Sequence, residues 1–237
     1  MHTLTRWDIM QFQRYLITEK QVSRSYQNQS INAIKFYLEQ VLGQDRLYFD
    51  LDRPKKTQKL PEVLSIKEVQ AVLRATLFLK HKAMLTTIYS AGLRIGELLN
   101  LKIGDIDSDN MRIWVREGKG VKDRMTVLSP MLLKLLRRYY INHQPKEYLF
   151  EGPSGGQYSA TSVRKVLQRS VKKANIHKTV RPHTLRHSFA THLLENGTNL
   201  RYIQILLGHT STKTTEIYTH VTSKVIEDVK SPLDLMV

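Results

Sequence analysis

The 237-residue sequence contains no cysteine and no apolar run near the length of about 20 residues that a membrane-spanning helix requires. Without cysteine the chain has neither a disulfide framework nor a thiolate nucleophile. The first residues, MHTLTRWDIMQ, lack the apolar core of a secretory signal peptide. Together these absences predict a cytoplasmic protein.

Acidic residues are scarce relative to basic ones. The sequence has 37 Lys and Arg against 21 Asp and Glu, which gives a net charge of +16 and a pI near 10.0. Such a surface attracts polyanions, because lysine and arginine displace the counterions condensed on phosphate backbones. Nucleic acid is therefore the expected partner, with a solubility charge or a membrane-surface patch as alternatives.

The first part of the chain predicts a small helical domain. Apolar residues recur at helical spacing over 4–19 and again over 23–41, and the domain is expected to span residues 1–53. Residues 54–61 then break the periodicity with two prolines and several basic side chains, including Lys55 and Lys56. This composition predicts a semi-rigid basic linker, which we take as the domain boundary.

Residues 62–237 predict a larger second domain. Ser65 and Glu68 have the spacing of a capping box at the start of a helix. Strands are expected at 111–115 and 124–128, joined by a glycine-containing hairpin turn. Further helices are predicted from about residues 81, 94 and 129 and over 160–174, 183–196 and 199–207, with a short helix carrying Tyr218. The expected fold is mainly α with a small antiparallel β-sheet, an α+β arrangement.

Six residues spread over 125 positions carry the groups that phosphodiester chemistry needs. They include cations to hold a phosphate, acids to protonate a leaving oxygen and a hydroxyl nucleophile. The six candidate catalytic residues are Arg94, Lys119, His183, Arg186, His209 and Tyr218.

Arg94 follows a glycine break in an apolar helical stretch, where a guanidinium needs an acceptor. An ion pair with Glu97 is the structural alternative for it. Arg186 lies three residues after His183, so both side chains can point at one spot from the same helix face. A packing motif at a helix N-terminus is the alternative for that pair. Two converging arginines would give planar, bidentate donors to one phosphate.

The remaining candidates are weaker when each is taken alone. Lys119 lies at a predicted hairpin tip, where a lysine is commonly just solvated. His209 follows a glycine at a helix end, where its ring could donate to an anion. Tyr218 is one of eleven tyrosines and would ordinarily be a core residue. Its ordinary pKa of about 10 makes it a weak nucleophile unless cationic neighbours or a base assist it.

The histidines also raise the question of a metal site. His183 and His187 have the i, i+4 spacing that can ligate zinc. No HExxH pattern accompanies them, and no nearby carboxylate or cysteine completes a ligand set. We therefore predict no metal, and His187 and His192 are interpreted as core or capping residues.

One predicted helix carries a broad basic face. Over residues 160–174, apolar side chains form one stripe and basic side chains the other. The basic face suits a DNA groove, and a solvated helix face is the alternative. The candidate DNA-binding residues, including those of the linker and the hairpin, are Lys55, Lys56, Lys122, Arg124, Arg164, Lys165, Arg169, Lys172 and Lys173.

These residues and motifs resemble the tyrosine recombinases, the integrase family that includes phage, integron and Xer-type enzymes. The resemblance runs from about Leu60 to Tyr218 through the segments AGLRIGELL, GKG, HTLR and LGH. It implies that Arg94, His183, Arg186 and His209 surround the scissile phosphate, that Lys119 is a general acid toward the 5′ oxygen, and that Tyr218 is the nucleophile. Every position that the motifs define holds the expected residue type.

The resemblance implies a mechanism and a partner. Tyr218 would form a 3′-phosphotyrosyl intermediate on double-stranded DNA, without a cofactor, and a 5′ hydroxyl would rejoin the strand. Four protomers would assemble on paired sites, and the tail at 221–237 would dock on a neighbour. Residues 1–53 have room for about two long helices, fewer than the usual core-binding bundle, so a truncated core-binding domain is one interpretation.

Three alternatives to a site-specific DNA recombinase remain open on the sequence. A type IB topoisomerase-like enzyme would nick and reseal DNA with the same chemistry but without pairing two sites. In a catalytically decayed DNA-binding module, the protein would still bind DNA but the six residues would no longer support cleavage. A metallo-phosphodiesterase would require a metal and would be stopped by a chelator.

Overall fold

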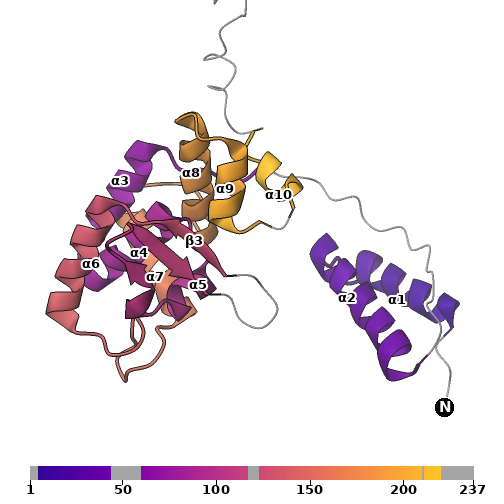
Figure 1. Cartoon of the computed structure of the whole chain (residues 1–237). Helices are drawn as coiled ribbons and strands as arrows, with labels where there is room; N and C mark the ends of the chain where they lie inside the picture. Colours follow the sequence, from indigo (N-terminus) through magenta and orange to yellow (C-terminus); the bar gives the residue numbers. More distant parts are fainter. Residues whose placement is uncertain (1–4, 44–59, 117–122, 210, 220–237) are drawn as a thin grey trace, which may run out of the picture. The chain divides into compact units, whose positions relative to one another are not determined.

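The chain divides into two compact units, residues 1–59 and residues 60–237, in a computed structural model that describes residues 5–43, 60–116, 123–209 and 211–219 (Figure 1). The division falls inside the predicted linker at 54–61. Lys55 and Lys56 lie outside the described residues, as do Lys119 and Lys122 of the hairpin and the tail from residue 220.

Within residues 5–43, the smaller unit contains two α-helices and a π-helical turn. These are α1 (Arg6–Thr18), α2 (Arg24–Phe36) and η1 (Tyr37–Val41). Thr5 and Asp8 form a capping box at the start of α1, with the Thr5 N–H donating to the Asp8 carboxylate at 2.9 Å. The buried apolar side chains in this described stretch are Ile9, Leu16, Ile31 and Leu38. Both predicted helices are confirmed.

The larger unit contains eight α-helices, one 3-10 turn and three strands among its described residues. They are α3 (Ile66–Ala75), α4 (Leu79–Ala91), α5 (Ile95–Asn100), η2 (Ile103–Asp105), β1 (Ile106–Asp107), β2 (Arg112–Val115), β3 (Arg124–Val127), α6 (Pro130–His143), α7 (Ala160–Lys173), α8 (Pro182–Glu195), α9 (Leu200–Leu207) and α10 (Lys213–Glu216).

The prediction of a mainly α fold with a small antiparallel sheet is confirmed. The sheet has the order β1-β2-β3, and β2 pairs with β3 from Arg112 opposite Val127 to Val115 opposite Arg124. The capping box at α3 is also present, since the Ser65 N–H donates to the Glu68 carboxylate at 2.7 Å. Strand β1 is an addition to the predicted elements, because two residues carry no periodicity that a sequence pattern can detect.

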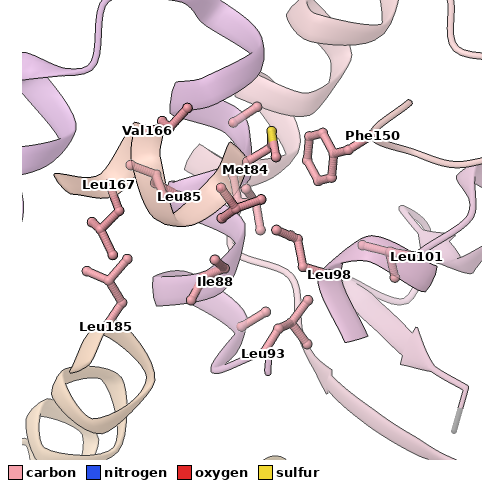
Figure 2. Close-up of a cluster of buried hydrophobic side chains, with 14 of the residues drawn as sticks. Met84, Leu85, Ile88, Leu93, Leu98, Leu101, Phe150, Val166, Leu167 and Leu185 are labelled. Atoms are coloured by element: carbon pink, nitrogen blue, oxygen red, sulfur yellow. The ribbon is translucent and has the colours of Figure 1, made fainter. Parts of the chain in front are cut away.

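The main core lies around α4, which α6, α7 and α8 surround (Figure 2). Leu85 and Ile88 of α4 lie toward Leu167 of α7 and Leu185 of α8 (Figure 2), and all four side chains are inaccessible. Burying a side chain of this size contributes roughly 1.5–3 kcal/mol. The core therefore holds α8 in place, and α8 carries two of the six candidate catalytic residues, His183 and Arg186.

A second, smaller cluster packs α8 against α9 and the segment after α10. It contains Phe189 and Ala190 of α8, Ile203 and Leu207 of α9, and Tyr218. The ring of Tyr218 is thus part of a hydrophobic cluster, which holds the candidate nucleophile against the helix that carries Arg186.

Candidate active site

Arg186 is the most deeply buried cation of the site, with 2% of its surface exposed. Its guanidinium donates to the carbonyl oxygen of Gly92 at 2.7 Å and to that of Leu207 at 2.6 Å. These carbonyls terminate α4 and α9, so one side chain of α8 joins the ends of two other helices. Burial lowers the pKa of Arg186 to about 10, so the group stays charged at neutral pH.

Gly92 makes this arrangement possible. Its φ is +62°, and a Cβ placed there would lie 2.5 Å from the Phe189 ring. Only glycine combines that left-handed conformation with so close an approach. The turn ends α4 and presents the Gly92 carbonyl to Arg186.

Arg94 is the N-cap residue of α5 and is directed at Glu97. Its guanidinium donates to the Glu97 carboxylate at 2.6 Å, and its backbone N–H donates to the other carboxylate oxygen at 2.7 Å. About a third of the side chain, 36%, is exposed. The ion pair considered as a structural alternative is therefore present, and it leaves part of Arg94 accessible.

Glu97 organises three arginines, which we call the arginine cluster: Arg94, Arg124 and Arg186. Only 8% of Glu97 is exposed. Burial by itself would raise its pKa, but hydrogen bonds and charge from Arg124, with contributions from Arg94 and Arg186, bring the pKa to about 2. One carboxylate thus faces three guanidiniums, and the cluster keeps an excess of positive charge.

The structure corrects the expectation for Arg124. The sequence predicts that this residue contacts DNA phosphates, yet only 9% of it is exposed. Its guanidinium donates to both Glu97 oxygens, at 2.9 and 2.7 Å, and to the Leu206 carbonyl at 2.9 Å. Arg124 therefore occupies a place inside the fold. No sequence pattern indicates this, because a strand residue beside a basic hairpin looks exposed.

Tyr218 lies close to this positive charge. It follows α10 by two residues, so the short helix ends before the tyrosine that it is predicted to carry. The residue is fully buried, and its hydroxyl lies 3.0 Å from Nδ1 of His187. Burial raises the pKa of Tyr218 to about 12, although the charges of Arg186 and Arg94 act in the opposite direction.

His209 packs against the ring of Tyr218. The two rings stack with centroids 6.5 Å apart and an interplanar angle of 12°. Nδ1 of His209 lies 3.0 Å from the Thr215 hydroxyl, which fixes the ring orientation. Burial, then the charges of Arg186 and Arg94, lower the pKa of His209 to about 4. The ring is therefore neutral at pH 7.

His183 occupies the exposed rim of the site. It lies at the start of α8, and its ring stacks on His187 with centroids 6.0 Å apart. Burial of part of the ring, followed by the charges of Arg186 and Arg94, lowers the pKa of His183. His183 also lines a crevice of about 410 Å³ together with Ile95, Arg164, Gln168, Val180, Arg181 and Pro182.

Five of the six candidate catalytic residues are thus brought together from α5, α8 and the segments after α9 and α10. The sixth, Lys119, lies outside the described residues. Strands β2 and β3 nonetheless pair as predicted, up to Val115 opposite Arg124. Arg124, the first residue of β3, belongs to the arginine cluster, and Lys119 lies in the sequence between β2 and β3.

Sequence reasoning misses two residues of the site. It interprets His187 as a core or capping histidine, and Glu97 only as a partner for Arg94. The spacing of His187, one turn after His183, is a usable signal, since it places both rings on one helix face. Among the described residues, no three histidine or carboxylate side chains gather as a metal-binding group.

The predicted basic face is present on α7. Val163, Val166, Leu167 and Val171 are buried, while the cations lie on the exposed side: Arg164, Lys165, Arg169, Lys172 and Lys173. Arg164 also lines the crevice beside His183, which connects this face to the active site.

None of the helices in the described parts of the chain is long and apolar enough to cross a bilayer.

Comparison with known proteins identifies the family of the chain. Residues 62–224 match the family model described as the phage integrase family, and residues 1–46 match its N-terminal SAM-like domain. The chain is 43% identical to y4qK of Sinorhizobium fredii, described as an integrase/recombinase, over 98% of this chain and 76% of that protein. It is 34% identical to the tyrosine recombinase XerD of Listeria monocytogenes, over 96% of this chain and 82% of XerD.

Among solved structures, the XerA recombinase superposes with a TM-score of 0.67 at 34% identity, covering 94% of this chain and 81% of XerA. The family model covers well over half of the sequence, and XerD aligns along nearly all of it. The chain therefore belongs to the phage integrase family and is a tyrosine-type site-specific recombinase.

Proposed function

We propose that Tyr218 is the nucleophile with which this recombinase breaks and rejoins double-stranded DNA. Its oxygen attacks the scissile phosphorus, the bond from phosphorus to the 5′ oxygen breaks, and a 3′-phosphotyrosyl bond forms. A 5′ hydroxyl of a partner strand then attacks the phosphotyrosine and releases Tyr218. The energy of the broken bond is kept in the intermediate, so the cycle uses neither ATP nor a metal.

The observation that carries this proposal is the position of the Tyr218 hydroxyl, buried beside Arg186 and close enough to Arg94 for both charges to affect its pKa. A pentavalent phosphorane gains negative charge on its non-bridging oxygens as the tyrosine attacks. Guanidiniums held in place before the reaction stabilise that charge without reorganisation, and such electrostatic terms are usually the largest in catalysis.

The arginine cluster divides this work between its members. Arg94, which is partly exposed, contacts the phosphate directly, while Glu97 and Arg124 hold it in position. His183 and His209 donate to the phosphate oxygens. Lys119 delivers a proton to the 5′ leaving oxygen from the hairpin between β2 and β3.

DNA lies along the basic face of α7, which carries Arg164, Lys165, Arg169, Lys172 and Lys173. Because Arg164 lines the same crevice as His183, a duplex on this face passes the active site. Lys55 and Lys56 of the linker and Lys122 of the hairpin add further phosphate contacts. Recombination between two sites requires four protomers, so the assembly on paired DNA is a homotetramer, and it acts in the cytoplasm.

The proposal is tested with a suicide substrate nicked next to the scissile phosphate, which traps the covalent adduct. Tyr218→Phe should bind DNA with unchanged affinity and form no adduct. The matched control is Tyr89→Phe, since the Tyr89 hydroxyl also contacts a histidine of α8, His192, at 2.9 Å. The control should form adduct at close to the normal rate, and an adduct with Tyr218→Phe would exclude Tyr218 as the nucleophile.

Offering the trapped adduct a second duplex separates strand exchange from simple resealing. A recombinase ligates the trapped strand to the second duplex. A topoisomerase-like enzyme reseals only the original strand, and that result would contradict the assignment of strand exchange.

A further inference from the structure

His187 is placed to act on the hydroxyl of Tyr218. Its Nδ1 lies 3.0 Å from the phenolic oxygen, within hydrogen-bond distance, and the two ring centroids are 5.7 Å apart. The contact joins the middle of α8 to the segment after α10. Neither the expected phosphate contacts nor the expected leaving-group acid accounts for a histidine at this position.

The surroundings of His187 keep its ring neutral. The charged or titratable groups that act on it are His183 and Arg186 on α8, with His209 from the end of α9 close by. Burial, then His183 and Arg186, lower the pKa of His187 to about 4. A neutral imidazole has one ring nitrogen with a free lone pair, and a phenol that remains protonated can donate to it. With the ring proton on Nε2, a neutral His187 would accept the Tyr218 O–H at Nδ1 across this 3.0 Å contact.

The other two histidines of the site are arranged differently. His209 meets Tyr218 face to face, and its Nδ1 is directed at the Thr215 hydroxyl. His183 is exposed, and its ring stacks on that of His187. His183 is therefore accessible from solvent, whereas His187 contacts the hydroxyl of the candidate nucleophile.

We infer that His187 is the general base that takes the proton of Tyr218 during attack on the DNA. The bond between phosphorus and the tyrosine oxygen forms, the bond to the 5′ oxygen breaks, and the phenolic proton moves to Nδ1 of His187. The leaving 5′ oxygen takes its proton from Lys119. On rejoining, both protons return, so His187 ends each cycle neutral. This inference rests on the proposed role of Tyr218 and adds the group that activates it.

A proton acceptor and a merely structural histidine differ in one measurable respect. Loss of a general base slows the reaction by a smaller factor when the nucleophile is more acidic, because less proton transfer is then needed in the transition state. Replacing Tyr218 with a fluorinated tyrosine lowers the phenol pKa with little change in shape. Fluorination should therefore rescue a variant that lacks the base, and should not rescue one that is only poorly packed.

The experiment measures single-turnover cleavage of the suicide substrate by the full-length protein. Asparagine at position 187 keeps a hydrogen-bond acceptor but cannot take a proton. His187→Asn should cleave about 10²-fold more slowly or worse, as expected for loss of general-base catalysis. Fluorotyrosine at position 218 should then raise the rate of His187→Asn by a larger factor than it raises the rate of the wild type.

The matched control is His192→Asn. His192 is buried on the same helix, and its Nδ1 lies 2.9 Å from another tyrosine hydroxyl, that of Tyr89. This variant should cleave within a few-fold of the wild type, and fluorotyrosine at position 218 should give it no extra gain. Thermal unfolding and DNA binding identify variants that fail to fold. If His187→Asn fails to fold, His187→Gln is used in its place.

Two results would overturn the inference. One is a cleavage rate for the position-187 variants that is no lower than that of His192→Asn. The other is a slow rate that fluorotyrosine does not selectively restore. Both results leave Tyr218 as the nucleophile, whereas an adduct formed by Tyr218→Phe would refute the proposed function itself.

Discussion

The carboxylate of Glu97 and the guanidinium of Arg186 lie 3.5 Å apart, and 7% and 2% of their respective side chains are exposed. Glu97 also accepts from Arg94 and Arg124. A candidate catalytic arginine is thus held by the same carboxylate that holds two further arginines. The stability of the fold and the geometry of the candidate active site therefore depend on one acidic residue.

Replacing Glu97 with glutamine should therefore destabilise the larger unit. The three guanidiniums would then repel one another with no anion between them. Breaking a buried ion pair by removing one partner costs roughly 3–5 kcal/mol. Urea unfolding of Glu97→Gln measures this loss, and Glu147→Gln is the control, because Glu147 pairs with Lys102 at an exposed position. A loss no greater than that of the control would contradict the central place given to Glu97.

The same carboxylate predicts how stability depends on pH. The folded-state pKa of Glu97, about 2, lies below the ordinary glutamate pKa of 4.5. Its contribution is therefore fully present above about pH 4.5 and is lost as the pH falls toward 2. The melting temperature should fall across this acid range, and it should fall less in Glu97→Gln than in the wild type. If the melting temperatures of the two proteins fall equally with pH, the Glu97 anion is not strongly stabilised in the fold.

Replacing Arg186 with lysine should reduce cleavage by ~10²-fold or more while leaving DNA binding largely intact. A lysine keeps the charge but lacks the planar fork that reaches the Gly92 and Leu207 carbonyls together. Single-turnover adduct formation and a mobility-shift assay on the same duplex separate the two effects. A rate close to that of the wild type would show that charge alone suffices at this position.

Gly92→Ala should destabilise the fold and slow cleavage together. The added Cβ would meet the Phe189 ring and would also oppose the positive φ of residue 92. Gly96→Ala is the control, since Gly96 lies in α5 with nothing within 4 Å of an added Cβ. We expect Gly92→Ala to lower the melting temperature clearly and Gly96→Ala to leave it unchanged or raise it. Equal melting temperatures would remove the steric argument for Gly92.

Charge reversal on α7 should weaken DNA binding and its dependence on salt. Removing one phosphate contact should reduce the slope of log affinity against log salt by about 1. We expect this for Lys165→Glu and Arg169→Glu, measured by titration at several salt concentrations. Lys134→Glu, an exposed position on α6, supplies the control. If all three variants bind DNA equally weakly, α7 is not the DNA-binding face.

The fold class and most element positions could be predicted from the sequence because the local signals are strong. The capping residues Ser65 and Ser129 mark helix starts, and the apolar stripe of α7 has a clear helical period. The family motifs also indicate the residues that lie around Arg186. Each of these signals is contained within a few neighbouring residues.

The features that sequence reasoning misses depend on long-range packing. The sequence does not indicate that Arg124 and Arg186 are both buried. In the fold, Arg124 donates to the Glu97 carboxylate, whereas Arg186 donates to two carbonyls at helix ends. His187 resembles a core residue because its partner, Tyr218, is 31 positions away. A local sequence pattern cannot indicate a contact between residues that are so far apart in the chain.

The residue that carries the DNA in the trapped adduct identifies the nucleophile without recourse to any variant. Tryptic digestion of the adduct releases the peptide of residues 214–224, which contains a single tyrosine. We predict that mass spectrometry finds a 3′-linked phosphonucleotide on Tyr218 in this peptide. A nucleotide attached to any other residue, or linked through its 5′ end, would contradict the assignment of Tyr218.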